Sequence, residues 1–327
     1  MGHKVWIVES PGGAFCEVEL PHPTLEKNQV LVKISASAVN PLDTKIRAGK
    51  AAHARQPLPA VLGLDMAGIV EEVGSSVAAF RPGDEVYGMV GGVGGLQGTL
   101  AEFVAIDADL LAHKPRNLFM RQAAALPLST ITAWEGLVDR AKVHAGQKVL
   151  IHAGAGGVGH IAVQVARAFE AEVFATVSPD KKSIVETFGA SPIDYRSVSV
   201  EEYIAASTGG RGFDIVYDTV GGATLDASFN AVKQYTGHVL SCLGWGTHSL
   251  APLSFRGASY SGVFTLYPLI TGKGRAHLGE ILTQAAALAE AGKLTPLLNE
   301  QRFSTADIAA AHTLVESGAL GKVVVEL

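Results

Sequence analysis

Cysteine is scarce in this sequence: its 327 residues include only Cys16 and Cys242. Two thiols can form neither a disulfide framework nor a structural zinc site of four cysteines. A chain of this size with so few cysteines is typical of reduced intracellular proteins. We therefore expect a cytoplasmic protein without disulfides.

The chain also lacks an excess of basic residues and an unbroken apolar span. Lys and Arg total 26 against 31 Asp and Glu, which gives a formal net charge of -5, so we expect no nucleic-acid partner. The longest uncharged stretch, residues 234–255, contains glycines, histidines and a proline, which a lipid-spanning helix would carry at high cost. The N-terminus has no apolar signal core. We predict no membrane span, export signal or lipid anchor.

The residues that are abundant indicate a folded protein of two domains. Hydrophobic residues make up 48% and charged residues 17% of the chain, and 327 residues exceed the size at which one hydrophobic core usually keeps growing. Up to about Pro115, short β-type runs alternate with turn residues. From about Arg121, strands alternate with helical patterns, which predicts βαβ units and a parallel sheet.

After Gly272 come two helical patterns, residues 277–294 and 305–318, and a final strand over 322–327. They need a surface to pack on, and we expect the first domain to provide it. The predicted boundaries are 1–122 for the first part of a β-rich domain, 123–266 for a dinucleotide-binding domain, and 267–327 for the rest of the β-rich domain. The glycine-rich segment 89–98 is interpreted as a mobile loop.

Residues 148–169 carry the most specific motif. The strand pattern KVLIHA runs into a GxGxxG sequence, and an amphipathic helix follows. Such glycines allow a tight turn, close approach of the backbone to a pyrophosphate, and close helix-on-sheet packing. Because strand, loop, helix and second strand occur in order, we predict a dinucleotide site here. Its residues are Gly154, Gly156, Gly157, Val158 and Gly159.

The end of the second strand, residues 172–177, bears on the choice of cofactor. An NAD site places an acid there to bind the ribose hydroxyls, whereas this strand is followed by Ser178, Lys181 and Lys182. The pattern favours NADPH, with Ser178 and Lys182 at the 2′-phosphate. Two alternatives stay open: the lysines could simply solvate a helix start, and Asp180 could be an NAD-type acid displaced by two residues.

Several motifs in order resemble the medium-chain dehydrogenases/reductases, and within them the zinc-free quinone oxidoreductases of the zeta-crystallin type. The resemblance covers essentially the whole chain. It implies a GroES-like domain built from both chain ends, an inserted Rossmann domain and an α/β fold with the cofactor in a cleft. The motifs are NPLDTKIRAG (40–49), GLDMAGIVEEVG (63–74), FRPGDEVYG (80–88), LPLSTITAWEGL (126–137), HAGAGGVGHIAVQVAR (152–167), YDTVGG (217–222) and GKVVVEL (321–327).

The superfamily includes enzymes that need zinc and enzymes that do not. Its zinc alcohol dehydrogenases hold a catalytic zinc through Cys and His. By resemblance, Asn40 stands where those enzymes have their first Cys, and Leu64 and Asp65 stand where they have His-Glu. We therefore predict no metal, and an acceptor that is already electron-poor, such as a quinone or an α,β-unsaturated carbonyl.

The resemblance also implies site residues. Asn40 and Asp43 would lie in the active cleft, Thr132 near the nicotinamide, and Tyr195 at the 2′-phosphate; Gly244 and Lys322 join them as predicted cofactor-binding residues. Simpler roles remain open, because Asn-Pro often opens a turn, Asp43 can cap a helix, and Thr132 can be an ordinary helix-face residue. Lys45 stands where relatives commonly have Tyr at the mouth of the pocket, and it could donate a proton or attract an anionic acceptor.

There are three alternatives to a quinone oxidoreductase. A short-chain dehydrogenase is excluded, because no Tyr here has Lys four positions later. A 2-alkenal or enone reductase of the same fold, and a non-catalytic NADPH-binding crystallin-like protein, stay open. We further predict a homodimer that pairs an edge strand over Tyr260–Leu266, a run rich in aromatic and β-branched residues.

Overall fold

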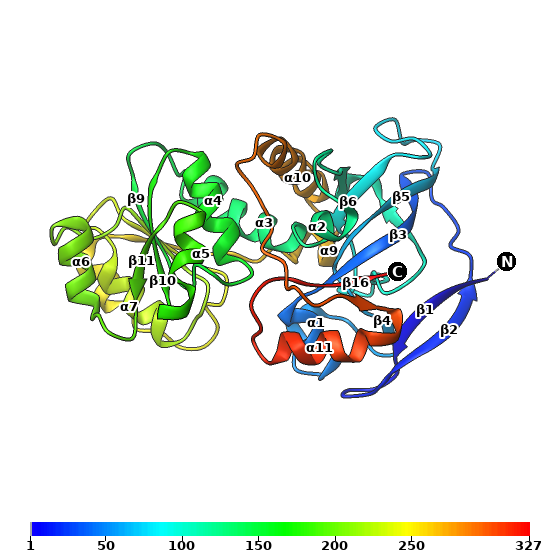
Figure 1. Cartoon of the computed structure of the whole chain (residues 1–327), viewed down its shortest axis with the longest axis horizontal. Coiled ribbons are helices and arrows are strands. Elements are labelled where there is room, and N and C mark those ends of the chain that lie inside the picture. Colours follow the sequence, from blue (N-terminus) through cyan, green and yellow to red (C-terminus); the bar gives the residue numbers. More distant parts are fainter. Residues whose placement is uncertain (1) are drawn as a thin grey trace. The chain divides into compact units, whose positions relative to one another are not determined.

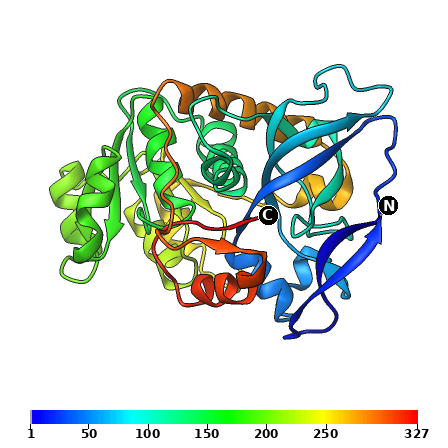
Figure 2. The ribbon, with the colours of Figure 1, turned by 45° about the vertical axis from the view of Figure 1, so that its right-hand side comes forward.

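The computed structural model describes residues 2–327, which form two compact units (Figure 1). Unit 1 comprises the chain up to Leu128 together with Leu266–Gly292 and Pro296–Leu327. Unit 2 comprises Ser129–Thr265 and the short segment Lys293–Thr295. The two ends of the chain thus belong to the same unit, where the blue strands and the red helix α11 lie in Figures 1 and 2.

A seven-stranded sheet organises unit 1, with the order β15-β16-β3-β5-β6-β8 and β7 paired to β3. β3 is the longest of the described strands and pairs antiparallel with β5, β7 and β16, which its β-branched residues favour. The strands are β3 (Gln29–Val39), β5 (Asp65–Val73), β6 (Glu85–Met89), β7 (Phe103–Asp107), β8 (Leu111–His113), β15 (Phe303–Ser304) and β16 (Val323–Glu326).

A smaller sheet and several α-helices complete the described part of unit 1. The sheet has the order β2-β1-β4. Helix α10 packs against β8, and α11 packs against β16 and α1, so both C-terminal helices contact the unit expected from the sequence. The elements are β1 (Gly2–Val8), β2 (Phe15–Pro21), β4 (Ala60–Val61), α1 (Pro41–Arg47), α2 (Met120–Ala124), α9 (Tyr267–Thr271), α10 (Arg275–Glu290) and α11 (Ile308–Glu316).

The glycine-rich segment 89–98 corrects one expectation, because it is packed rather than mobile. Its backbone bonds to the chain before β5: the Gly98 N–H donates to the Val61 carbonyl at 3.1 Å. A Cβ on Gly91 would lie 1.8 Å from the carbonyl oxygen of Gln97, and one on Gly98 would lie 2.3 Å from the backbone of Leu62. The glycines therefore serve close backbone packing inside unit 1.

Unit 2 is built on a six-stranded parallel sheet with the order β11-β10-β9-β12-β13-β14. The order reverses at β9, so the segments after β9 and β12 diverge at the carboxyl edge, the usual place for a ligand in such sheets. The strands are β9 (Lys148–Ile151), β10 (Glu172–Val177), β11 (Ser191–Asp194), β12 (Ile215–Asp218), β13 (His238–Ser241) and β14 (Ser259–Gly262).

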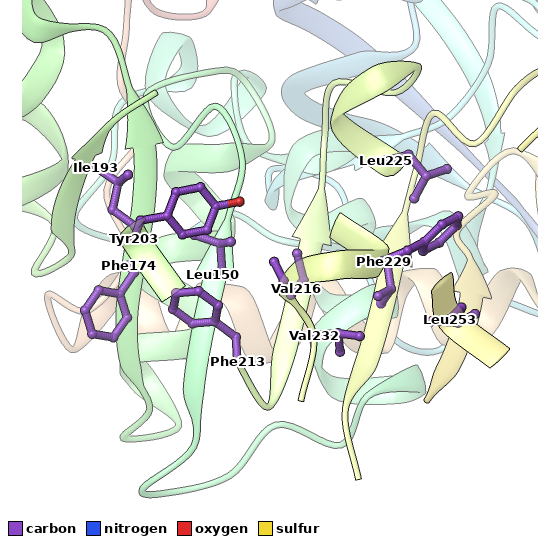
Figure 3. Close-up of a cluster of buried hydrophobic side chains, with 12 residues drawn as sticks. Leu150, Phe174, Ile193, Tyr203, Phe213, Val216, Leu225, Phe229, Val232 and Leu253 are labelled. Carbon is purple, nitrogen blue, oxygen red and sulfur yellow. The ribbon is translucent and has the colours of Figure 1, made fainter. Parts of the chain in front are cut away.

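Helices cover this sheet, and the core between them is apolar. Figure 3 shows one cluster, in which the Phe174 and Phe213 rings meet edge to face with centroids 5.5 Å apart. The helices are α3 (Pro127–Trp134), α4 (Gly159–Ala168), α5 (Lys182–Thr187), α6 (Val200–Thr208), α7 (Ala223–Ala231) and α8 (Ala251–Arg256), and a π-helical turn spans Glu135–Arg140. None of the helices within residues 2–327 has both the length and the apolar character that crossing a bilayer requires.

The predicted strand over Tyr260–Leu266 is shorter and placed differently in the structure. β14 ends at Gly262 and is itself the last strand of the parallel sheet, paired with β13. Beyond Gly262 the N–H of Val263, which is buried, still donates to the carbonyl of Ser241 in β13 at 2.9 Å. The expectation of a strand at an exposed edge is nevertheless met by Ser259–Gly262, because β14 has a neighbour on one side only.

Candidate active site and cofactor site

The first turn of α1 places two of the predicted residues together. Pro41 occupies the first helical position, where its missing N–H costs nothing. The backbone N–H of Asn40 donates to Oδ2 of Asp43 at 2.7 Å, and the N–H of Asp43 donates back to the carbonyl of Asn40 at 2.9 Å. Asp43 therefore acts as a helix cap, the simpler role left open by the sequence.

The carboxamide of Asn40 is held from both sides. Its Nδ2 donates to Oδ2 of Asp65 at 3.0 Å, and its Oδ1 accepts from Nζ of Lys322. Oδ1 of Asp65 accepts the backbone N–H of Leu128 at 2.9 Å, and Nζ of Lys322 lies 3.8 Å from Oδ2 of Asp65. Asn40, Asp43, Asp65 and Lys322 thus form one polar cluster, called the buried cluster below.

Burial controls the protonation of this cluster. Asp43 is 1% exposed, and its Oδ1 has no hydrogen-bond partner within residues 2–327. Burial raises the pKa of Asp43 to about 7 and that of Asp65 to about 6, and burial lowers the pKa of Lys322. Two carboxyl groups share one lysine here, so the buried cluster can hold a proton near neutral pH.

The other two predicted catalytic residues lie outside this cluster. Lys45 is on α1 but is exposed. Thr132 is on α3 in unit 2, where it is buried and its carbonyl accepts the hydroxyl of Tyr217 at 2.6 Å. Asp65 was not among the predicted site residues. Its place in the site could have been inferred from the sequence, because it stands where the zinc enzymes have their glutamate.

The predicted dinucleotide loop connects β9 to α4. The N–H of Gly156 donates to the carbonyl of Ala153 at 2.8 Å, which closes a tight turn. A Cβ on Gly159 would lie 2.1 Å from the carbonyl oxygen of Ala153, and one on Gly154 would lie 2.5 Å from Cβ of Ala175. Gly154 and Gly159 therefore leave no room for a side chain. A helix start of this kind offers N–H groups to an anion, although the N–H of His160 already donates to the carbonyl of Gly156 at 3.1 Å.

The candidate 2′-phosphate site lies where β10 and β11 end. Val177 pairs with Asp194, so Ser178 and Tyr195 follow at neighbouring strand ends. Nζ of Lys182 lies 4.0 Å from Oδ2 of Asp194, and Tyr195 is exposed.

Two further charged residues, Asp180 and Arg196, lie at the candidate 2′-phosphate site. The Ser178 hydroxyl hydrogen-bonds to Asp180 and thereby lowers the pKa of that carboxyl, so Asp180 competes for the serine. Arg196 was not predicted; its guanidinium lies 5.7 Å from the centroid of the Tyr195 ring. The only sequence feature that pointed to Arg196 was its position directly after Tyr195.

Further groups gather at the carboxyl edge of the parallel sheet. Asp218, at the end of β12, accepts the Gly221 N–H at 2.9 Å and the Ser241 hydroxyl at 2.7 Å, and so fixes the turn that follows. His152 precedes the dinucleotide loop; burial lowers its pKa to about 4, so the ring is neutral. Gly244 follows β13, and a Cβ there would lie 2.3 Å from the hydroxyl of Tyr260.

The residues do not suit a zinc ion. Across residues 2–327 no three His, Cys, Asp or Glu side chains come together in an arrangement that could hold a metal. The buried cluster offers an amide, two carboxyl groups and an ammonium group, but no thiolate or imidazole.

The comparisons with known proteins show the family to which the chain belongs. Residues 26–116 match the alcohol dehydrogenase GroES-like domain family, and residues 188–325 match the family described as zinc-binding dehydrogenase. The chain is 35% identical to the NADPH-dependent alkenal/one oxidoreductase, chloroplastic, of Arabidopsis thaliana, over 98% of this chain and 79% of that protein. The chain belongs to the medium-chain dehydrogenase/reductase superfamily.

Solved structures support this membership of the medium-chain superfamily. The crystal structure of an alcohol dehydrogenase superfamily protein from Novosphingobium aromaticivorans is 55% identical, with a TM-score of 0.97 and 99% of each chain covered. The quinone oxidoreductase from Coxiella burnetii is 29% identical, with a TM-score of 0.82 and 100% of each chain covered. Unit 1 is thus a GroES-like domain and unit 2 a Rossmann-like domain.

Proposed function

We propose that this medium-chain reductase uses NADPH to reduce an electron-poor conjugated carbonyl compound, either a quinone or a 2-alkenal or enone. The observation that carries the proposal is the loop between β9 and α4, in which Gly154 and Gly159 leave no room for a side chain. At the next strand ends it is followed by Ser178, Lys182 and Tyr195. The names of the Arabidopsis and Coxiella relatives support the two acceptor classes.

The chain's own residues would bind the cofactor and hold a proton. NADPH, when bound, supplies the hydride. The N–H groups at the start of α4 bind the pyrophosphate, and Lys182 gives the 2′-phosphate a charge-assisted bond that a ribose hydroxyl cannot match. The reduction also consumes a proton, and Asp43 can hold one because its pKa is about 7.

Zinc has no part in this proposal. Without a set of metal ligands, an acceptor has to be polarised by hydrogen bonds, which suits quinones and enones better than simple alcohols or ketones. Dialysis against a strong chelator should leave turnover and melting temperature unchanged. Stoichiometric bound zinc, or inactivation that added zinc reverses, would contradict this part of the proposal.

A substrate panel tests the proposed function. NADPH and NADH are each run with quinones, 2-alkenals, enones and simple alcohols, and consumption of the reduced cofactor is followed. We expect turnover with NADPH and at least one conjugated class. Analysis of the product separates the two, because a quinone gives a hydroquinone and an enone loses its C=C bond. Tight NADPH binding without turnover of any acceptor would favour the non-catalytic alternative.

Two further features belong to the proposal. We infer a homodimer that pairs the free edge of β14, since an exposed sheet edge readily takes up another strand. We also place the protein in the cytoplasm, on the basis of its two cysteines. Size measurement tests the first and localisation of a tagged protein tests the second.

A further inference from the structure

The segment between Asp43 and Asp65 has an unusual charge. Residues 44–64 contain no Asp or Glu, but they contain Lys45, Arg47, Lys50 and Arg55 as well as His53. The whole chain has a net charge of -5, so this segment stands out as locally positive. It begins on α1, the helix that carries Asp43.

A cavity of about 330 Å³ lies against this segment in unit 1. Ile46, Ala51 and Pro57 give it apolar walls, and Gly49, Gln56 and Arg55 also line it. The side chain of Gln56 already binds the backbone, because its Oε1 accepts the Gly95 N–H at 2.9 Å. Arg55 is therefore the charged group of the lining, and no carboxylate opposes it there.

The backbone holds Arg55 in an uncommon conformation. Arg55 follows a short 3-10 helix, Ala52–Ala54, and has φ of 50° and ψ of 37°, in the left-handed region that residues other than glycine seldom adopt. Such strain often accompanies a functional position. The side chain is exposed, and within residues 2–327 we find no ion pair for it.

Lys45 is a second cation of the same segment. Burial and the charge of Lys45 both lower the pKa of His53, so the ammonium group of Lys45 acts on the stretch that leads to Arg55. Like charges placed together without a carboxylate attract an anion. The apolar walls beside them suit the carbon chain of a ligand.

We infer that this cavity binds the anionic end of the acceptor, so that the preferred substrate is a quinone or enone whose tail ends in a carboxylate or a phosphate. The inference rests on the proposed function and narrows its substrate class. Arg55 is the specificity-determining residue: its guanidinium pairs with the anion while the tail packs on Ile46, Ala51 and Pro57. The conjugated carbonyl group itself does not need this charge.

The test uses acceptors that differ only at the far end of a saturated tail. A benzoquinone and an aliphatic enone are each prepared with a carboxylate, a phosphate monoester or a primary amide, separated from the reacting group by three methylene groups so that reactivity is equal. We expect the KM of an anionic acceptor to be about tenfold lower than that of its amide, with similar kcat. The carboxylate and phosphate arms show which anion is preferred.

Variants identify the residue responsible. Arg55→Asn removes the charge but tolerates the left-handed backbone, and we expect it to raise the KM of the anionic acceptor about tenfold while the KM of the amide stays within about twofold. Arg55→Lys should restore much of the preference. Lys273→Asn changes an exposed lysine of the same unit that does not line the cavity, and it should change neither constant.

The outcomes separate the inference from the proposed function. Equal KM values for anionic and amide acceptors, or an equal effect of Arg55→Asn on both, would overturn the anion site while leaving the reductase proposal intact. Raised salt should weaken binding of the anionic acceptors alone. If no acceptor is reduced with NADPH, the proposed function fails and the inference fails with it.

Discussion

At the scale of single residues, Asp43 links protonation to stability. Its pKa is raised from 3.8 to about 7 in the folded chain, so between these pH values the folded state keeps a proton that the unfolded chain loses. The contribution of Asp43 to the free energy of unfolding is therefore largest below pH ~4, and it is lost as the pH rises through 7. Asp43→Asn removes this dependence and keeps an oxygen to cap α1. We expect the melting temperature of the variant, relative to the natural chain, to rise by on the order of 5 °C between pH 4 and pH 8.

Asp307 provides a control with the opposite sign. It also occupies a capping position, where its Oδ2 accepts the Ser304 N–H at 3.1 Å, but the Ser304 hydroxyl lowers its pKa. Its contribution is present above the unfolded pKa and lost as the pH falls, so Asp307→Asn should lose stability relative to the natural chain as the pH rises. A melting-temperature difference for Asp43→Asn that does not change with pH would show that Asp43 titrates normally.

In the proposed function, Lys182 is responsible for the preference for NADPH over NADH. Its ammonium group lies 4.0 Å from Asp194, next to the end of β11 where Tyr195 follows. Lys182→Ala should raise the KM of NADPH about tenfold or more, equivalent to ~1.4 kcal/mol, with little effect on NADH. Lys181→Ala, the neighbouring change, should have the smaller effect. Equal losses for NADPH and NADH would remove Lys182 from the 2′-phosphate site.

The residue scale also shows what the sequence could predict about the site. Asn40 and Asp43 were predicted by resemblance, and they share one cluster because three positions on a helix turn bring them together. Asp65 and Lys322 join them from β5 and from the residue before β16. That contact depends on both strands pairing with β3, which no local pattern reports. The contacts of Lys322 are accordingly with Asn40 and Asp65, and its role toward the cofactor stays a prediction.

At the scale of elements, the start of α4 depends on glycine. A Cβ on Gly159 would lie 2.1 Å from the carbonyl oxygen of Ala153, so Gly159→Ala must displace the loop or the helix. We expect NADPH binding to weaken at least tenfold and stability to fall by about 1–3 kcal/mol. Gly262→Ala is the matched control, because the nearest contact of its Cβ is 3.8 Å away. Titration calorimetry with NADPH and urea unfolding measure both effects, and unchanged binding in Gly159→Ala would contradict the assigned role of the loop.

The elements themselves followed largely from sequence pattern. Short β-type runs were predicted up to about Pro115, and β3 is one of the strands observed there, with β-branched residues at Val30, Val32, Ile34 and Val39. Helix α6 was missed, although Ser199 and Glu202 form a reciprocal cap, with the Ser199 N–H donating to Glu202 at 2.8 Å. The glycine-rich segment 89–98 was misjudged because glycine is used both for flexibility and for close packing, and only tertiary contacts distinguish the two.

The buried cluster joins three elements through Lys322. Removing one partner of a buried ion pair leaves the others charged without compensation, so Lys322→Met should destabilise the chain by about 3–5 kcal/mol. Lys322→Met combined with Asp65→Asn should recover part of this loss. Lys114→Met is the control: Lys114 is equally buried, but its partner Glu85 is half exposed and can be rehydrated. A Lys322→Met variant of normal stability with weakened NADPH binding would instead assign Lys322 to the cofactor.

At the scale of the whole molecule, the open edge at β14 predicts a dimer. Large apolar groups remain exposed in the elements that precede β14: Phe255 on α8 is 88% exposed, and Tyr235, whose N–H donates to the carbonyl of Arg256, is 84% exposed. Phe255→Asp places a charge on the surface without disturbing the core.

Light scattering should give the natural chain a mass twice the 34.0 kDa of one chain, and Phe255→Asp should shift it toward the mass of one chain. The melting temperature of the natural chain should rise with protein concentration, because dimerisation stabilises the folded state by mass action; that of the variant should not. Phe119→Asp makes the same change at a side chain that is 80% exposed in unit 1, and it should remain dimeric. A natural chain with the mass of one chain, or a Phe255→Asp variant that stays dimeric, would exclude this edge as the interface.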